Sequence, residues 1–369
     1  MADKNMELIV NVNVTSAGSA VAATSVNTVG VIVTDSVVSG KSETTGKYYS
    51  DADQVKDIFG DSSDAYKFAL VFFGQARHPD RLYIGIAESL DEDDIEAVMD
   101  MPEFVDVYHW VVALTAPTDS TKTNVVAQLK ALNLKASNDY KIVHVEFTAS
   151  AAATFTAVKA LFDGWGEGTS HVAGLSEYKA TRVAVYCHNV EDDHIGAAIC
   201  ADRCGVDPAR GTWAHKELAN VSPMAMTKSQ LQQAMDTGYN VYTSIAKSPR
   251  IFMGTTCSKV NFIDTIIKAD VLKFRIQESV FGALQTGNEG YGIDYDDDGI
   301  ASLGGCVTNE LNRAFNNHYI HDDFSLSLPL FADIPASDKA IRKISGIKGS
   351  VRLMDSIHTV VSIDITAQK

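Results

Sequence analysis

The stretch RLYIGIAESLDEDDIEAVMDMPEFVDVYHWVVAL, residues 81–114, places two apolar runs of strand length around a short helical segment. The runs, residues 81–87 and 107–114, are rich in the β-branched and aromatic side chains that favour strands. Residues 91–99 follow a helical pattern with an acidic first turn, which suits the positive end of a helix dipole. A strand, a helix and a second strand in this order predict an α/β layer with largely parallel strands.

The same alternation continues on both sides of this stretch. Further strands are predicted at residues 26–35, 140–147 and 182–186, and further helices at residues 51–59, 63–75, 120–132, 151–162 and 192–204. We therefore expect an α/β domain with a mainly parallel sheet over residues 26–210.

Beyond residue 213 the pattern changes. Short strands near residues 239–245 and 250–256 are followed by long helical patterns over residues 263–285 and 299–317. This mixture predicts an α+β C-terminal domain over residues 211–350.

Both ends of the chain show the alternation of a half-buried strand, with no partner strand beyond them. Residues 1–25 and 351–369 are therefore predicted to be extended arms that each carry a strand. The side chains on one face of these strands are Leu8, Val10, Val12 and Val14 at the N-terminal end, and Ile357, Thr359, Val361, Ile363 and Ile365 at the C-terminal end.

The composition excludes several classes of protein. The chain has 369 residues and a formal net charge of −16, whereas nucleic-acid binding needs clustered Lys and Arg, so nucleic acid is not expected as a partner. No signal peptide is visible, and every apolar run is shorter than about 18 residues, so membrane insertion is not expected. Five cysteines at irregular spacing predict reduced thiols in a cytosolic product.

The charge is unevenly distributed along the chain. Residues 88–106 contain nine acidic residues and no basic one, whereas residues 341–369 carry a net charge of +3. The basic side chains before the last strand, Arg342, Lys343, Lys348 and Arg352, are expected to contact the acidic surface of another copy. The alternative is a solvated acidic face with a few unrelated basic residues.

A possible phosphate-binding loop follows the first predicted buried strand. Gly40, Lys41 and Ser42 resemble the second half of such a loop. Its first glycine would stand at position 35, where the carboxylate of Asp35 would repel a phosphate. A plain surface loop is therefore the better interpretation.

A possible calcium loop lies between the two long helices. Asp294, Asp296 and Asp298 have the spacing that opens an EF-hand, but Gly305 stands where its last ligand should be glutamate. Because a helix is predicted to begin at Ile300, the helix dipole accounts for these acidic groups, and no metal is predicted.

A cysteine pair in the predicted helix over residues 192–204 is a possible metal site. Cys200 and Cys204 lie one helical turn apart, downstream of His188 and His194, but structural zinc usually needs four ligands at closer spacing. Packing of the helix against the sheet is the favoured role. No GxSxG, HExxH or Cys–His framework occurs either, so neither enzymatic activity nor a cofactor is predicted.

The second half of the chain resembles the contractile tail sheath proteins of bacteriophages, in their shorter lineage, and of phage-derived contractile injection systems. A strand motif G-x-N-V-Y is followed by Gly-Thr, by an Ile-Asp turn into a helix, and by the helix motif D-x-L-K-x-x-I-Q. These motifs are matched by Gly238, Asn240, Val241 and Tyr242, by Gly254 and Thr255, by Ile263 and Asp264, and by Asp270, Leu272, Lys273, Ile276 and Gln277. The resemblance extends to residues 48–86 and covers nearly the whole chain.

The resemblance implies a structural protein without an active site. Its α/β domain would project outward, its C-terminal domain would lie against an inner tail tube, and both arms would add strands to sheets of neighbouring copies. The resulting helical polymer would contract and drive the tube through the host envelope during genome delivery. Expected partners are further copies, the inner tube, and baseplate and tail terminator proteins, in a virion tail that assembles in the host cytoplasm.

The alternative function class is an enzyme. The chain is then an α/β enzyme of unknown substrate that binds a nucleotide near Gly40 or a metal near Asp294.

Overall fold

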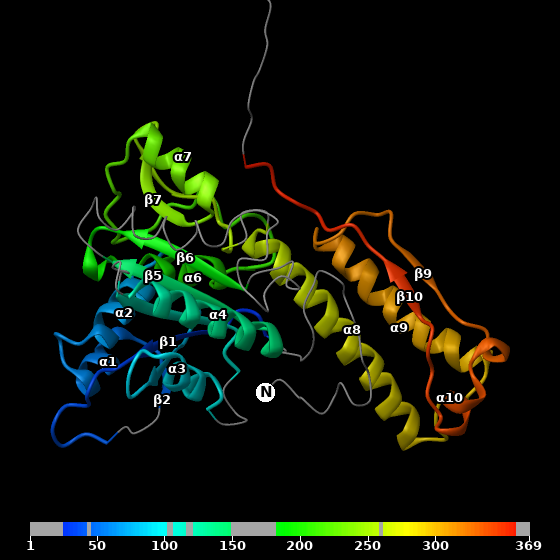
Figure 1. Cartoon of the computed structure of the whole chain (residues 1–369). Helices are drawn as coiled ribbons and strands as arrows, with labels where there is room; N and C mark the ends of the chain where they lie inside the picture. The colour runs from blue at the N-terminus through cyan, green and yellow to red at the C-terminus, as the bar shows by residue number, and fades with distance from the viewer. Residues whose placement is uncertain are drawn as a thin grey trace, which may run out of the picture.

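The structure is a computed structural model and describes residues 25–42, 46–101, 106–115, 121–148, 182–257 and 261–358. In these residues an eight-stranded sheet lies between helices, and two long helices extend away from it (Figure 1). The predicted helix over residues 151–162 and most of both predicted arms lie outside the described residues.

The eight-stranded sheet is mainly parallel, as the sequence predicts. Only the outermost pairs in the order β2-β3-β1-β4-β5-β6-β7-β8 are antiparallel. All residues of β1 are buried, which is typical of a parallel strand covered on both faces. The strands of this sheet are β1 Val29–Val33, β2 Gly46–Tyr49, β3 Leu82–Ile86, β4 His109–Thr115, β5 Ile142–Thr148, β6 Val183–His188, β7 Asn240–Ile245 and β8 Ser248–Phe252.

Helices cover both faces of the sheet, because successive strand side chains point to opposite faces and are apolar on both. Val31 and Val111 belong to one core cluster, whereas Ile32 and Val112 belong to the other. The helices of the first face are α1 Ala52–Phe59, α2 Asp64–Phe73 and α6 Ile195–Cys204, which follows the 3-10 helix η2 Glu191–Asp193. The helices of the second face are α3 Glu92–Met99, α4 Lys122–Asp139 and α7 Lys228–Thr237.

The sheet crosses the boundary that the sequence predicts between residues 210 and 211. β6 runs parallel to β7, with Tyr186 opposite Asn240, and β8 adds an antiparallel edge. The change of pattern after residue 213 therefore marks the end of regular strand and helix alternation, not the edge of the sheet. Pairing between strands about 50 residues apart leaves no local signal in the sequence.

Two further elements differ from the sequence prediction. β2 was not predicted, and α4 continues to Asp139 although its last turns are polar. Asn133 is buried in this part of α4, and its side-chain oxygen accepts a hydrogen bond of 2.6 Å from the backbone N–H of Arg182. Asn133, just beyond the predicted helix end, therefore serves a tertiary contact.

Two long helices, α8 Ile263–Glu289 and α9 Asp297–Asn316, form a hairpin that extends away from the sheet (Figure 1). The first half of α8 packs in the core of the first sheet face through Ile263 and Ile267. Farther along α8, Leu272 and Ile276 join a separate core cluster with Leu311 of α9. One continuous helix thus connects the sheet and the hairpin.

The chain after α9 runs along the hairpin and forms a second, small sheet. β9 Ser325–Ser327 and β10 Lys348–Ser350 pair antiparallel, and the connection between them holds η3 Phe331–Asp333 and α10 Ala336–Ala340. Beyond β10 the chain returns toward the eight-stranded sheet (Figure 1).

Candidate assembly site

The small sheet of β9 and β10 presents free backbone edges at the surface. Lys348 pairs with Ser327 and Ser350 with Ser325, and no third strand joins them in the described part of the chain. All three residues of β10 are exposed. Each strand of a two-stranded sheet has one edge of unpaired N–H and C=O groups, and so small a sheet is marginal alone. This sheet is therefore a template for added strands.

Exposed apolar side chains occupy the connection between β9 and β10. Leu330 and Ile341 are 61% and 69% exposed, and Leu328 and Ile347 are less so. We call these four side chains the apolar rim. Exposed apolar groups that gather on one short segment mark a surface that contacts another molecule.

The predicted basic contacts lie on the same part of the molecule. Arg342, Lys343 and Lys348 are exposed. Arg352 is also exposed, and its Nε lies 3.0 Å from a carboxylate oxygen of Asp323. Exposed basic side chains therefore adjoin the apolar rim, with Asp323 among them.

The segment after β10 is fixed to the α/β part of the chain as far as His358. The Lys268 ammonium of α8 donates to the backbone carbonyl of Met354 at 2.7 Å. His358 Nε2 lies 2.5 Å from the Thr212 hydroxyl, and the His215 ring lies 3.1 Å from the His358 carbonyl oxygen. Burial lowers the pKa of His358, so its neutral form is favoured in this contact.

Most residues of the predicted terminal strands lie outside the described part of the chain. Ile357 is 85% exposed and belongs to no strand in the described residues. The other side chains assigned to the two arms lie outside the described residues: Leu8, Val10, Val12, Val14, Thr359, Val361, Ile363 and Ile365. The described part of the C-terminal arm therefore ends at His358, which contacts Thr212 and His215. The pairing of the arm stays a prediction.

Buried ionic contacts hold α8 against the sheet. The guanidinium of Arg182 donates to both carboxylate oxygens of Asp270, at 2.6 and 2.7 Å, and the Tyr108 hydroxyl donates to the same carboxylate at 2.5 Å. Burial, and after it the Asp270 charge, raises the pKa of Tyr108 well above its ordinary value, so the phenol remains a donor. One turn along α8, the Lys273 ammonium donates to the Tyr140 hydroxyl at 2.6 Å.

Asn240 fixes the chain between β8 and α8. Its amide donates to the carbonyls of Val185 and Thr255, at 3.1 and 2.8 Å, and its oxygen accepts from the N–H groups of Gly254 and Thr255. All four bonds are buried, so the side chain is fully satisfied. Asn240, Asp270 and Lys273, which belong to the motifs of the sheath resemblance, therefore hold α8 against the large sheet. The hairpin that begins with α8 carries the small sheet.

The loop at Gly40 does not have the geometry of a phosphate site. The carboxylate of Asp35 accepts hydrogen bonds from the backbone N–H groups of Asp64 and Ala65, at 3.2 and 2.7 Å. Asp35 thus occupies the helix N-terminus that would attract an anion. Lys41 and Ser42 are exposed, and the next described residues belong to β2 instead of a helix.

The aspartates considered for calcium form the start of α9. Asp296 is the N-cap, and its side chain accepts from the N–H of Gly299 at 2.9 Å. The helix begins at Asp297, before the predicted start at Ile300. Asp294 and Asp298 are exposed in the same turn, so the helix start is the role that the geometry supports.

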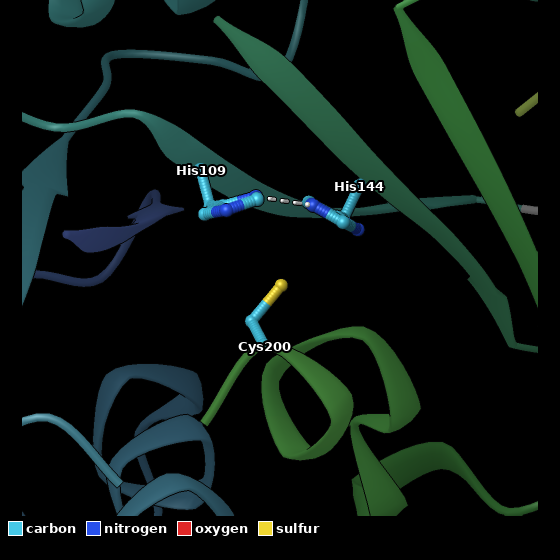
Figure 2. A group of neighbouring side chains, drawn as sticks. All are labelled: His109, His144 and Cys200. Atoms are coloured by element: carbon cyan, nitrogen blue, oxygen red, sulfur yellow. Dashed lines mark hydrogen bonds between the residues drawn. The ribbon is translucent and has the colours of Figure 1, made fainter. Parts of the chain in front are cut away.

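Cys200 and Cys204 pack in the core, as the favoured interpretation expects, and His188 and His194 have other partners. His188 lies 3.0 Å from Asp193, and His194 lies 3.0 Å from Glu146. Cys200 instead points toward His109 and His144, which come from β4 and β5 (Figure 2). All five cysteines are free thiols.

Sequence reasoning did not select His109 and His144. The available signal was a polar residue inside each of two apolar strand runs, VYHWVVAL and YKIVHVEF. That signal predicts a buried polar side chain but not the partner that it meets.

The fold was compared with known proteins. No sequence profile of a protein family matches the chain, and no curated protein matches it in sequence. Among solved structures, a chain of the anti-feeding prophage helical sheath in the contracted state superposes with a TM-score of 0.63 at 14% identity, covering 98% of both chains. A chain of the 6-fold symmetrised anti-feeding prophage baseplate gives a TM-score of 0.63 at 13% identity, covering 97% of this chain and 98% of its own. The chain therefore has the fold of contractile tail sheath-like proteins.

No helix in the described ranges is both long and apolar enough to cross a membrane.

Proposed function

We propose that this chain, which has the fold of contractile tail sheath-like proteins, is the sheath subunit of a contractile phage or phage-derived particle. Copies polymerise helically around an inner tail tube and contract to drive the tube through the host envelope. The observation that carries the proposal is agreement in fold over nearly the full length of both chains, including a chain from a contracted helical sheath. The baseplate and tail terminator proteins are the further partners, and the particle assembles in the host cytoplasm.

The proposed links between subunits are the two terminal arms. A strand of about nine residues spans roughly 30 Å, which is enough to reach a neighbouring copy. The free edges of β9 and β10 are the proposed acceptors, since main-chain pairing supplies affinity and alternate side chains supply register. The apolar rim beside this sheet gives an arriving arm an apolar contact surface.

The orientation of the subunit follows from the same proposal. The α/β part faces outward, and the hairpin of α8 and α9 faces the tube. The buried ion pair between Arg182 and Asp270 joins α8 to the sheet. The α/β part and the first half of the hairpin can therefore move as one rigid body, as this orientation requires. Rigid bodies can then rotate during contraction while the strand links stay closed.

The charge distribution supports contacts between copies. α3 carries the acidic segment, with Asp91, Asp93 and Asp100 exposed, and it lies at the opposite end of the molecule from β10 and α10 (Figure 1). The acidic and basic surfaces cannot meet within one chain. They are therefore available to steer neighbouring copies together.

Electron microscopy of the purified protein tests the proposal. The full chain is expected to form long tubes or large rings. A variant that lacks residues 359–369 keeps His358 and its contacts with Thr212 and His215, so it is expected to fold and remain monomeric. The matched control is the full chain with residues 359–369 replaced by a glycine and serine linker of equal length. Normal tubes from either variant would show that the C-terminal arm does not link the subunits, and the absence of any polymer from the full chain would contradict the sheath function.

A further inference from the structure

His109, His144 and Cys200 converge in the core between the sheet and α6 (Figure 2). One nitrogen of each ring and the cysteine sulfur lie within 4.8 Å of one another, and all three side chains are fully buried. They come from β4, β5 and α6, so the site exists only in the folded chain. The described residues add no fourth His, Cys, Asp or Glu to this group.

The surroundings exclude water, and a partner on its other nitrogen orients the His144 ring. His144 Nδ1 lies 3.1 Å from the Tyr186 hydroxyl, which leaves Nε2 directed at His109. Metal-bound histidines usually have such a partner on the remote nitrogen. Trp213 covers both rings, with centroid distances of 5.3 Å to His109 and 5.4 Å to His144.

A shared proton explains part of this geometry. His109 Nδ1 and His144 Nε2 are 3.0 Å apart, as in a hydrogen bond between two neutral imidazoles. That bond needs no thiol, yet the Cys200 sulfur points between the two rings (Figure 2). Two nitrogens bound at about 2.0 Å to one three-coordinate ion lie roughly 3.5 Å apart, so the two ring nitrogens, now 3.0 Å apart, would separate by about 0.5 Å on binding.

We propose that these three side chains bind copper(I) in a three-coordinate site. Two neutral imidazoles and one thiolate are the donors that favour soft or borderline ions, and a trigonal set of two His and one Cys is typical of copper. The charges also favour the monovalent ion, because one thiolate neutralises Cu⁺ but leaves Zn²⁺ with a buried positive charge.

Glu146 does not supply the missing negative charge for zinc. It is the buried carboxylate on the same strand as His144, but its two oxygens are already bound. One lies 3.0 Å from His194 Nδ1, and the other accepts from the N–H of Ala197 at 3.1 Å. Structural zinc also usually requires a fourth ligand.

Binding would fasten α6 to the centre of the sheet. Cys200 would bind as the thiolate, so its thiol gives up its proton as the copper–sulfur bond forms. One proton leaves as one Cu⁺ binds, and no electron is transferred. Since the site is closed by Trp213, the ion enters during folding.

The test uses the full chain with Cys306→Ser, which removes the one cysteine that is not fully buried. The protein is produced in copper-supplemented cells and, in parallel, refolded anaerobically with Cu⁺. Copper and zinc per chain are then measured by mass spectrometry, and the ligand set is read by X-ray absorption. We expect about one copper per chain, bound by two nitrogens and one sulfur.

Cys200→Ser should reduce copper to background. Cys204→Ser is the matched control, since Cys204 is buried one turn further along α6 and outside the group, and it should retain the ion. Absence of copper from both preparations, retention of zinc in its place, or equal copper in the two variants would overturn the proposal. The absorption spectrum of the parent chain decides the ligand set even where Cys200→Ser fails to fold.

Discussion

Asp270 on α8 accepts both terminal nitrogens of the Arg182 guanidinium, at 2.6 and 2.7 Å, with both side chains nearly inaccessible to solvent. Arg182 stands at the start of β6, in the middle of the sheet, so this pair joins the long hairpin to the α/β part of the chain. A bidentate pair fixes direction as well as distance. Asp270 is therefore a direct ionic link between α8 and the sheet.

Replacing Asp270 with alanine should strongly destabilise the fold. The substitution leaves the Arg182 guanidinium buried without its carboxylate, which typically costs about 3–5 kcal/mol. The free energy of unfolding, measured by urea denaturation, should fall by this amount. Asp323→Ala breaks the exposed pair with Arg352 and should cost at most about 1 kcal/mol. Equal effects of the two substitutions would show that the buried pair does not hold α8.

Two glycines share a backbone conformation but differ in the space around them. Their alanine variants can therefore distinguish the cost of backbone strain from the cost of overpacking. Gly254 and Gly211 have φ values of +75° and +76°. A Cβ at Gly254 would lie 2.7 Å from the backbone nitrogen of Ala214, whereas a Cβ at Gly211 would meet nothing within 4 Å. Gly211→Ala should therefore cost about 1–2 kcal/mol for the left-handed conformation alone. Gly254→Ala should cost about 1–3 kcal/mol more because of overpacking, which thermal denaturation of the two variants would measure.

Much of the α/β part of the fold could be predicted from local patterns. Strands such as β4 and β5 are apolar on both faces and alternate with helices, and each pattern lies within a few consecutive residues. The pairing of β6 with β7 could not be predicted, because Tyr186 meets Asn240 across a long connection that contains α6, α7 and an irregular stretch between them.

The buried polar groups were the least predictable part of the structure. Alternation along β4 and β5 places His109 and His144 in the sheet, but it does not give the distance between their rings. Asp270 and Lys273 were recognised only as parts of a sheath-like motif, and their partners Arg182 and Tyr140 lie about 90 and 130 residues away in sequence. The two charged side chains Asp270 and Lys273 are explained only by the packing of α8 on the sheet, which brings each of them to its polar partner.

The attachment of the C-terminal segment should depend on pH. Burial lowers the pKa of His358 below its ordinary value of 6.5, and His215 lowers it further, while Asp264 and Asp355 act in the opposite direction. The neutral ring is therefore favoured in the folded state, and its contribution is fully present above pH 6.5 and is lost as the pH falls. In hydrogen exchange, the protection factors of the backbone amides of residues 354–358 should therefore fall on acidification.

A substitution at this position provides the control for the pH effect. His358→Gln keeps a neutral polar side chain beside Thr212. The protection factors of residues 354–358 in this variant should therefore no longer change on acidification. His318→Gln, at an exposed position after α9, should retain the full response. An unchanged response in His358→Gln would assign the effect to another group.

The apolar rim should be needed for polymerisation but not for folding. Leu330→Asp and Ile341→Asp place a charge on side chains that are 61% and 69% exposed, so the free energy of unfolding should change by no more than about 0.5 kcal/mol. Tube formation, followed by light scattering, should be abolished because a carboxylate must lose water to enter an apolar contact. Leu70→Asp, on α2, is the control for a charge at an exposed apolar position. Tubes from both rim variants would exclude this surface from the subunit contact.

Reversal of the basic charges should change the salt dependence of assembly. Arg342, Lys343 and Lys348 are exposed near the small sheet, and the acidic side chains of α3 lie at the other end of the molecule. If the two surfaces attract each other between copies, added salt should slow polymerisation of the parent chain, because exposed charges are screened within a Debye length of about 10 Å at moderate ionic strength. Glutamate at all three positions should make assembly slow at low salt and faster as salt is added, since repulsion replaces attraction.

The matched control reverses Lys228, Lys247 and Lys56, three lysines on other surfaces, and changes the net charge by the same amount. Identical salt dependence in the two triple variants would mean that net charge, and not contact between these two surfaces, governs the rate of assembly.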